Sequence, residues 1–126
     1  MFKQVDYVMV VVSEMTRSIT FYRDKLGLPL KLESPNWTEF QTGATTLALH
    51  GGGKSQEKKT GNPGEQVAGT CSIGFNVENI DKTFADLKAN GVIFVMPPTE
   101  QKDEGIKLAV CIDPDGLPVS LAQMLK

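Results

Sequence analysis

The chain has few of the residues that mark secreted, disulfide-rich or metal-binding proteins. Among 126 residues there are two cysteines, one histidine and one tryptophan. Cys71 and Cys111 form no CxxC pair, and no histidine lies near either in the sequence. We expect two free, buried thiols in a reducing cytoplasm, with a disulfide or a metal site as the alternative.

Runs of one charge and long hydrophobic runs are also missing. The net charge is -2 at pH 7, and the densest basic cluster is the pair Lys58-Lys59. A nucleic-acid partner is therefore not expected. No apolar run approaches the roughly 20 residues that span a bilayer, and the N-terminal MFKQVDY lacks the apolar region of a signal peptide. We expect a cytoplasmic protein without a membrane partner.

The length and composition that are present fit one globular domain. A chain of 126 residues with 40% hydrophobic and 22% charged side chains can bury one sizeable core. We therefore expect a single domain over residues 1–126.

The clearest pattern is YVMVVVSEMTRSITFYRDKLGL, residues 7–28. β-Branched residues predict a strand over 5–13, and Ser13 or Thr16 can cap a helix after it. That helix has Ile19, Tyr22 and Leu26 at helical spacing and ends at Gly27. Three further strands are predicted over 30–33, 37–41 and 45–50.

A weaker copy of this pattern begins near residue 72. A strand is predicted over 70–77, followed by a helix that Asn79 caps and that ends at Asn90-Gly91. The helix carries a stripe of apolar residues, Ile80, Phe84 and Leu87. Three more strands are predicted over 92–96, 106–112 and 118–123.

The two matching patterns therefore predict the order β-α-β-β-β twice. Each copy would be one structural unit of the fold. The first module covers about residues 4–50 and the second about 70–126. The Gly-rich, charged segment 51–69 is expected to be a mobile connector. The predicted fold class is α+β, with two βαβββ modules that form a curved sheet around a cleft.

The repeat, FYRDKLGL at 21–28 and CIDPDGLPVSL at 111–121 together resemble the vicinal oxygen chelate superfamily. Its members include glyoxalase I, extradiol dioxygenases, and bleomycin and fosfomycin resistance proteins. The resemblance covers nearly the whole chain. It implies paired βαβββ modules, usually in a homodimer, which pair either within one chain or between two.

The resemblance also implies four metal-ligand positions, typically His or Glu, on strands that face the cleft. They correspond here to Tyr7, Ala48, Ser72 and Ser120. Alanine has no donor atom, and neutral hydroxyls are poor ligands for a divalent ion at neutral pH. We therefore expect no metal and no other cofactor.

A shift of register does not restore this metal site. One residue of slip turns each strand over, and the residues found there are apolar: Val8, Leu49, Ile73 and Leu121. His50 and Glu39 are the strong donors that remain nearby. Each has a plainer interpretation, as a polar residue at a strand end and as a solvated strand residue.

The side chains expected to face the cleft mix aromatic surface with a few hydrogen-bonding groups. Our candidate ligand-binding residues are Tyr7, Met9, Trp37, Glu39, Ala48, His50, Ser72, Asn76 and Ser120, and the same alternation adds Thr46, Cys111 and Ala122. Such a lining suits a small aromatic or amphipathic molecule. Trp37 can instead cover the end of the sheet, and Tyr7 can be a core phenol.

Three functional hypotheses follow. The first is a metal-free binding protein that sequesters an antibiotic or an aromatic metabolite. The second is a lyase or dioxygenase-type enzyme with an unconventional site, either metal-dependent or working by acid–base chemistry through Glu39, His50 or Tyr7. The third is a scaffold that acts only through protein contacts. No serine or cysteine has a base beside it in the sequence, so no catalytic residue is assigned.

Overall fold

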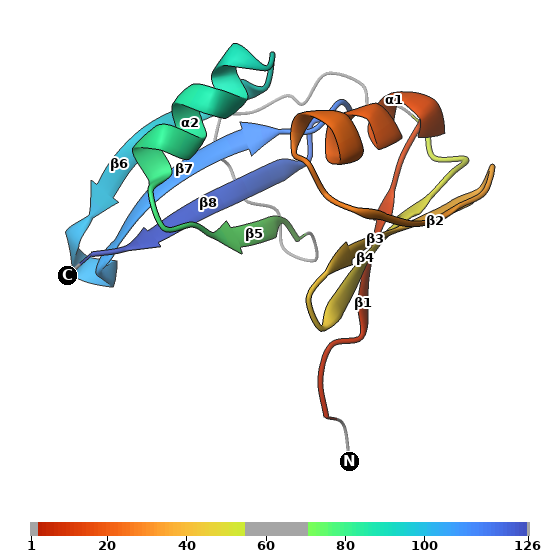
Figure 1. Ribbon diagram of the computed structural model, residues 1–126, viewed down its shortest axis with the longest axis horizontal. Coiled ribbons are helices and arrows are strands. Elements are labelled where there is room, and N and C mark those ends of the chain that lie inside the picture. Colours follow the sequence, from red (N-terminus) through yellow and green to blue (C-terminus); the bar gives the residue numbers. More distant parts are fainter. Residues whose placement is uncertain (1–2, 55–70, 126) are drawn as a thin grey trace. The chain divides into compact units, whose positions relative to one another are not determined.

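The computed structural model describes residues 3–54 and 71–125, and Figure 1 shows the path of the chain. The chain divides into two compact units, Met1–Ser55 and Gln56–Lys126. Each contains one four-stranded sheet and a helix, in the order β-α-β-β-β. The predicted α+β class and the repeated module are confirmed, whereas the single domain over 1–126 stays a prediction.

The sheet of the first unit has the strand order β1-β4-β3-β2. Its strands are β1 (Tyr7–Val11), β2 (Leu30–Glu33), β3 (Trp37–Thr42) and β4 (Thr45–His50). β1 runs parallel to β4, as a strand joined by a helical crossover can, and the other two pairs are antiparallel. The central strand β4 therefore fixes the position of both its neighbours.

The first helix begins regularly and then widens. Helix α1 (Met15–Ile19) is capped by Glu14, which accepts a hydrogen bond from the Arg17 amide at 2.5 Å, so the predicted caps at Ser13 and Thr16 are wrong. The chain continues as a π-helical segment, η1 (Thr20–Lys25). The wider turn changes which side chains face the sheet.

The π-helical segment buries two adjacent aromatic residues. The Leu26 amide donates to the carbonyl of Phe21, five residues back, at 2.9 Å. Phe21 and Tyr22 are both buried, whereas Leu26 is only partly so. Tyr22 packs against Phe21 and against Phe40 of β3, with ring centroids 4.9 and 5.9 Å away. The prediction assumed 3.6 residues per turn, which does not hold through a π turn. It therefore placed Leu26 on the buried stripe, where Phe21 lies instead.

The first residues of the predicted 51–69 connector are hydrogen-bonded to the first unit. Gly51 donates to the carbonyl of Asn36, and Gly53 to that of Val12, both at 3.0 Å. Residues 55–69 of the connector lie outside the described residues.

The sheet of the second unit has the order β5-β8-β7-β6, with helix α2 (Ile80–Ala89) packed on one face, as Figure 1 shows. A short 3-10 turn, η2 (Lys102–Glu104), follows β6. The strands are β5 (Ile73–Asn76), β6 (Ile93–Gln101), β7 (Ile106–Ile112) and β8 (Pro118–Met124). Asn79 caps α2 as predicted, by accepting from the Lys82 amide at 3.1 Å.

Strand β6 is longer than its predicted range of 92–96, which stopped at Pro97-Pro98. It continues to Gln101 because it is an edge strand, where proline is tolerated. Its pairing with β7 shifts register between Phe94 and Met96 and again before Thr99. Two bulges thus carry the chain past the prolines.

The core of the second unit lies between α2 and the sheet. Ile80, Ala109 and Leu121 are buried at its centre, with Phe75 and Phe94 among the side chains packed against them. No helix among the described residues is long and apolar enough to cross a membrane.

Both cysteines are free and Cys111 is buried, as predicted, but the prediction is wrong about the exposure of Cys71 and about the face on which Cys111 lies. Cys71 is exposed, although it was expected to be buried. Cys111 is fully buried beside Val119, on the face that α2 covers, so its predicted place on the cleft face is wrong. Burial raises the pKa of the Cys111 thiol to about 11, from the ordinary 9.0.

We expect the two thiols to react at different rates. A water-soluble disulfide reagent should modify Cys71 rapidly in the native protein and Cys111 only after unfolding, because burial disfavours the thiolate. The unfolded chain releases the Cys111 proton at a lower pH than the folded chain. The free energy of unfolding should therefore fall as the pH rises from 9.0 to about 11. Equal reaction rates in the native protein would contradict this placement of Cys111.

Candidate functional site

The face of the first sheet that points away from α1 gathers most of the predicted residues of that unit. We call it the open face. The pairings Tyr7 with Thr46, Met9 with Ala48, and Trp37 with His50 place alternate residues of β1, β3 and β4 on it. The predicted residues on this face are Tyr7, Met9, Trp37, Glu39, Thr46, Ala48 and His50.

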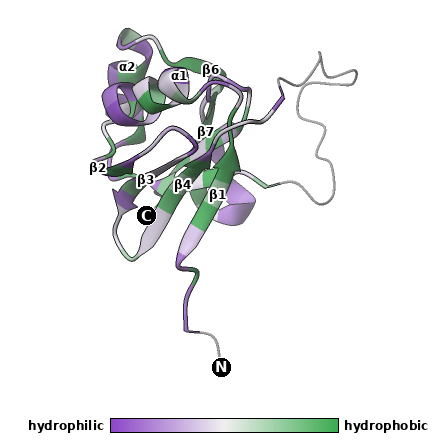
Figure 2. Ribbon diagram, turned by 90° about the vertical axis from the view of Figure 1, so that its right-hand side faces the viewer, coloured by the Kyte–Doolittle hydropathy of each residue, from purple (hydrophilic) through white to green (hydrophobic). Residues whose placement is uncertain are grey.

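The open face is unusually apolar for an exposed surface. Tyr7 is 59% exposed, Met9 44% and Val11 54%, and Leu32 of β2 is also exposed. Figure 2 shows hydrophobic colouring along much of β1 and β4. Contiguous exposed apolar surface on a small domain marks a place where something else binds.

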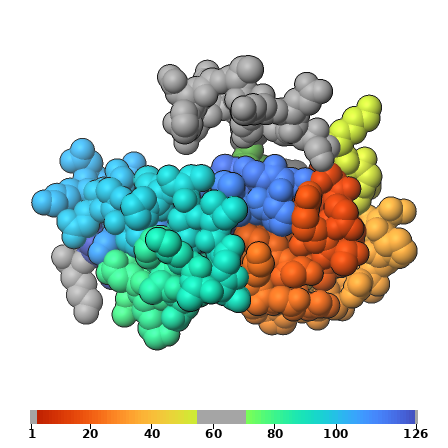
Figure 3. Space-filling view, turned by 90° about the horizontal axis from the view of Figure 1, so that it is seen from above, coloured from red at the N-terminus to blue at the C-terminus, as the bar shows by residue number. Residues whose placement is uncertain are grey.

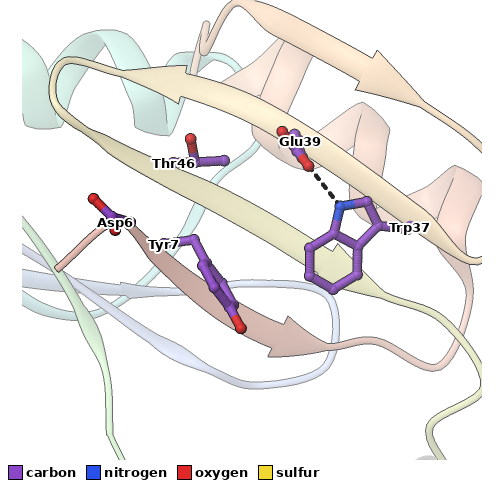
Figure 4. A pocket seen from close by; sticks show the side chains of 5 residues that line it. All are labelled: Asp6, Tyr7, Trp37, Glu39 and Thr46. Atoms are coloured by element: carbon purple, nitrogen blue, oxygen red, sulfur yellow. Dashed lines mark hydrogen bonds between the residues drawn. The ribbon is translucent and has the colours of Figure 1, made fainter.

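A hollow of about 380 Å³ lies on the open face, and Figure 4 shows the side chains around it. Asp6, Tyr7, Trp37, Glu39 and Thr46 line it. The Tyr7 ring stands edge-on to the Trp37 indole, with centroids 6.1 Å apart and planes at 72°. Trp37 also meets the His50 ring, with centroids 6.2 Å apart and planes at 87°. The aromatic residues thus form one continuous wall.

Glu39 holds this wall in place. Its Oε2 accepts a hydrogen bond from the Trp37 indole nitrogen at 2.7 Å, and its Oε1 lies 3.7 Å from the Lys31 ammonium. Lys31 in turn donates to Thr46 Oγ1 at 3.2 Å. Because both oxygens of Glu39 face donors or a positive charge, the carboxylate serves to orient Trp37. A carboxylate so engaged is poorly placed to abstract a proton.

The sequence did not reveal two members of this site, Asp6, which precedes β1, and Lys31. For Lys31 the reason lies in its strand. Its strand, β2, is short and exposed and shows no clear alternation. The pairing of β2 with β3 also shifts register between Leu30 and Leu32. Simple alternation of side chains along β2 therefore could not predict which face of the sheet Lys31 points to. The available signal was a basic residue on a strand next to one carrying Glu39.

The residues on the open face do not fit a divalent metal. Ala48 is fully buried in the floor between its partners Met9 and Glu39, and it brings no donor atom. The Nδ1 atom of His50 lies 2.7 Å from the carbonyl oxygen of Gly51, to which it donates when protonated. Within residues 3–54 and 71–125 no group of three or more His, Cys, Asp or Glu could hold a metal ion.

The predicted residues of the second unit are a separate set. Ser120 lies beside Gly74 and Val110, and Asn76 beside Ala122, on the sheet face opposite α2. Ser72 is exposed and precedes β5. Ser72 and Ser120, the positions of this unit at which the resemblance implied metal ligands, carry neutral hydroxyls, which are weak ligands for a divalent metal.

Comparison with known proteins agrees with this architecture. Residues 4–121 match the model of the Glyoxalase/Bleomycin resistance protein/Dioxygenase superfamily. The chain belongs to this superfamily. Within it, the uncharacterized protein YraH of Bacillus subtilis (strain 168) is 29% identical over 122 residues, which cover 92% of this chain and 94% of YraH.

Solved structures share the fold of this superfamily member. SMU.1112c matches with a TM-score of 0.80 and 24% identity, over 97% of this chain and 99% of that one. A glyoxalase/bleomycin resistance protein/dioxygenase from Nocardioides matches with a TM-score of 0.76 and 23% identity, over 100% and 86%. At such identities the likeness shows the fold alone.

The role given to Glu39 predicts a local effect on Trp37. In Glu39→Ala the indole loses its acceptor, so Trp37 should become more mobile, and the protein should lose about 1 kcal/mol of stability. Time-resolved fluorescence anisotropy and urea unfolding measure the two effects. Glu33→Ala, at the exposed end of β2, is the matched control and should change neither. Unchanged indole mobility in Glu39→Ala would refute the orienting role.

Proposed function

We propose that the protein binds a small aromatic or amphipathic molecule on the open face of the first sheet, and that it does so without a metal. The observation that carries the proposal is the aromatic wall of Tyr7 and Trp37 above a floor that contains the donorless Ala48. The wall offers rings for stacking where the metalloenzymes of the superfamily keep ligands. Sequestration of an antibiotic or an aromatic metabolite is the role that such binding would serve.

The shape and polarity of the hollow support this class of ligand. Its volume of about 380 Å³ lies within the range of small-molecule sites. Rings stack on Tyr7 and Trp37, while Met9 adapts its flexible thioether to the ligand surface. The Lys31 ammonium has three hydrogens and donates one of them to Thr46 Oγ1, so it can also donate to a polar substituent of the ligand and fix its orientation.

The enzyme hypothesis finds less support in the same residues. A glyoxalase- or dioxygenase-type reaction needs a metal. Ala48 has no donor atom, so it cannot supply one of the four ligands that such a metal would need. A metal-free acid–base reaction would need Glu39 or His50 free to move a proton. Glu39 is engaged by Trp37 and Lys31, and His50 lies against the carbonyl of Gly51.

We further propose that the protein is a cytoplasmic homodimer without a nucleic-acid or membrane partner. The exposed apolar side chains of β1 are consistent with assembly, and light scattering of the purified protein tests it. A monomer at all concentrations would contradict the homodimer but not the proposed binding site, whose residues all belong to one chain.

Trp37 gives a direct assay, because it is the only tryptophan in the chain. A library of aromatic and amphipathic antibiotics and metabolites should contain compounds that quench its fluorescence saturably. Tyr7→Ala should weaken their binding by about tenfold, since one stacked ring is worth about 1.4 kcal/mol. Met124→Ala, at an exposed position of the second unit, is the control and should bind normally. No quenching by any compound, or an unaffected Tyr7→Ala, would overturn the proposal.

A further inference from the structure

A second open groove lies within the second unit, between α2 and the edge strand β6. It has a volume of about 420 Å³. Phe84 and Lys88 of α2 line one side, and Ile93, Phe94, Val95 and Pro97 of β6 line the other. Figure 3 shows the atoms of α2 and β6 side by side at the surface. The groove shares no residue with the open face of the first sheet.

The β6 side of this groove is apolar and uncovered. Phe94 packs on the core and meets Phe84 edge-on, with centroids 4.7 Å apart and planes at 74°. Val95 is 61% exposed, at the point where β6, the last strand of its sheet, bulges between Phe94 and Met96. Ile93 adjoins the groove, but its pairing with Ile112 directs its side chain to the other face of the sheet. Apolar surface of this kind next to a groove is typical of a binding site.

The single charge in the groove is positive. The Lys88 ammonium lies 5.5 Å from the centre of the Phe84 ring. Two other lysines of this unit are paired with carboxylates, Lys82 with Asp86 at 2.7 Å and Lys107 with Asp81 at 2.9 Å. Across residues 3–54 and 71–125, no carboxylate forms an ion pair with Lys88. The groove therefore combines apolar walls with an uncompensated cation held by an aromatic ring.

We propose that this groove binds a small amphipathic carboxylate, an aliphatic or aromatic acid. Its apolar body lies against Phe94 and Val95, and its carboxylate lies beside the Lys88 ammonium. Charge complementarity selects the anion over a neutral or cationic molecule of the same shape. This site is independent of the function proposed for the first sheet.

Titration of the isotopically labelled full chain with sodium octanoate, followed by amide NMR, tests the proposal. Saturable shifts should appear in α2 and in β6 near Val95. Hexanoate should bind more weakly, by about threefold for each methylene removed, because the tail is buried. 1-Octanol, which lacks the charge, should bind more weakly than octanoate.

Two pairs of variants separate the charge from the apolar walls. Lys88→Gln should weaken octanoate by about threefold, as expected for a partly exposed ion pair, and leave 1-octanol unchanged. Lys82→Gln is the matched control and should change neither ligand. Val95→Ser should weaken both ligands, whereas Val5→Ser, on the first unit, should weaken neither. No saturable shifts, shifts confined to the first unit, or an unchanged octanoate affinity in Lys88→Gln would each overturn the proposal.

Discussion

The register of β4 between β1 and β3 decides the chemistry of the first unit. Met9, Ala48 and Glu39 lie side by side across the three strands, so the position between them is filled by a methyl group. Because side chains alternate, a slip of one residue would exchange the whole open face for the core face. The register is held from the other side, where Phe40 of β3 is fully buried against Tyr22. The core packing under η1 and the set of side chains on the open face are thus two results of one alignment.

The open face combines rigidity with exposure. Trp37 is half-buried. Glu39 accepts a hydrogen bond from its indole nitrogen, and Lys31, which donates to Thr46, lies beside the other oxygen of Glu39. A wall fixed before the ligand arrives loses less conformational entropy on binding. The same hydrogen bonds keep Glu39 from acting as a base. The arrangement is therefore better suited to holding a molecule than to converting it.

Much of this was readable in the sequence, because its periodicities are strong. Alternation and turn residues predicted the βαβββ repeat, and the residues of the first-sheet face followed from the same count. The failures have local causes. The π-helical segment at Thr20–Lys25 changes the helical period, and nothing in its sequence announces it. Bulges allow β6 to continue beyond Pro97-Pro98, where the predicted strand ended. A register shift in β2 changes the alternation of its side chains, so the face on which Lys31 lies was not predicted. Cys111 was misplaced because its strand is apolar on both faces, which leaves the phase of alternation open.

The central claim is that a ligand binds the open face without a metal. The measurement that tests it most directly is the affinity of a ligand found by Trp37 quenching, compared before and after removal of metals with a chelator and again with added Zn, Ni, Mn or Fe. The account predicts the same dissociation constant under all of these conditions, since Ala48, Tyr7 and their neighbours offer no metal site. Loss of binding on chelation, with recovery when one metal is restored, would contradict it.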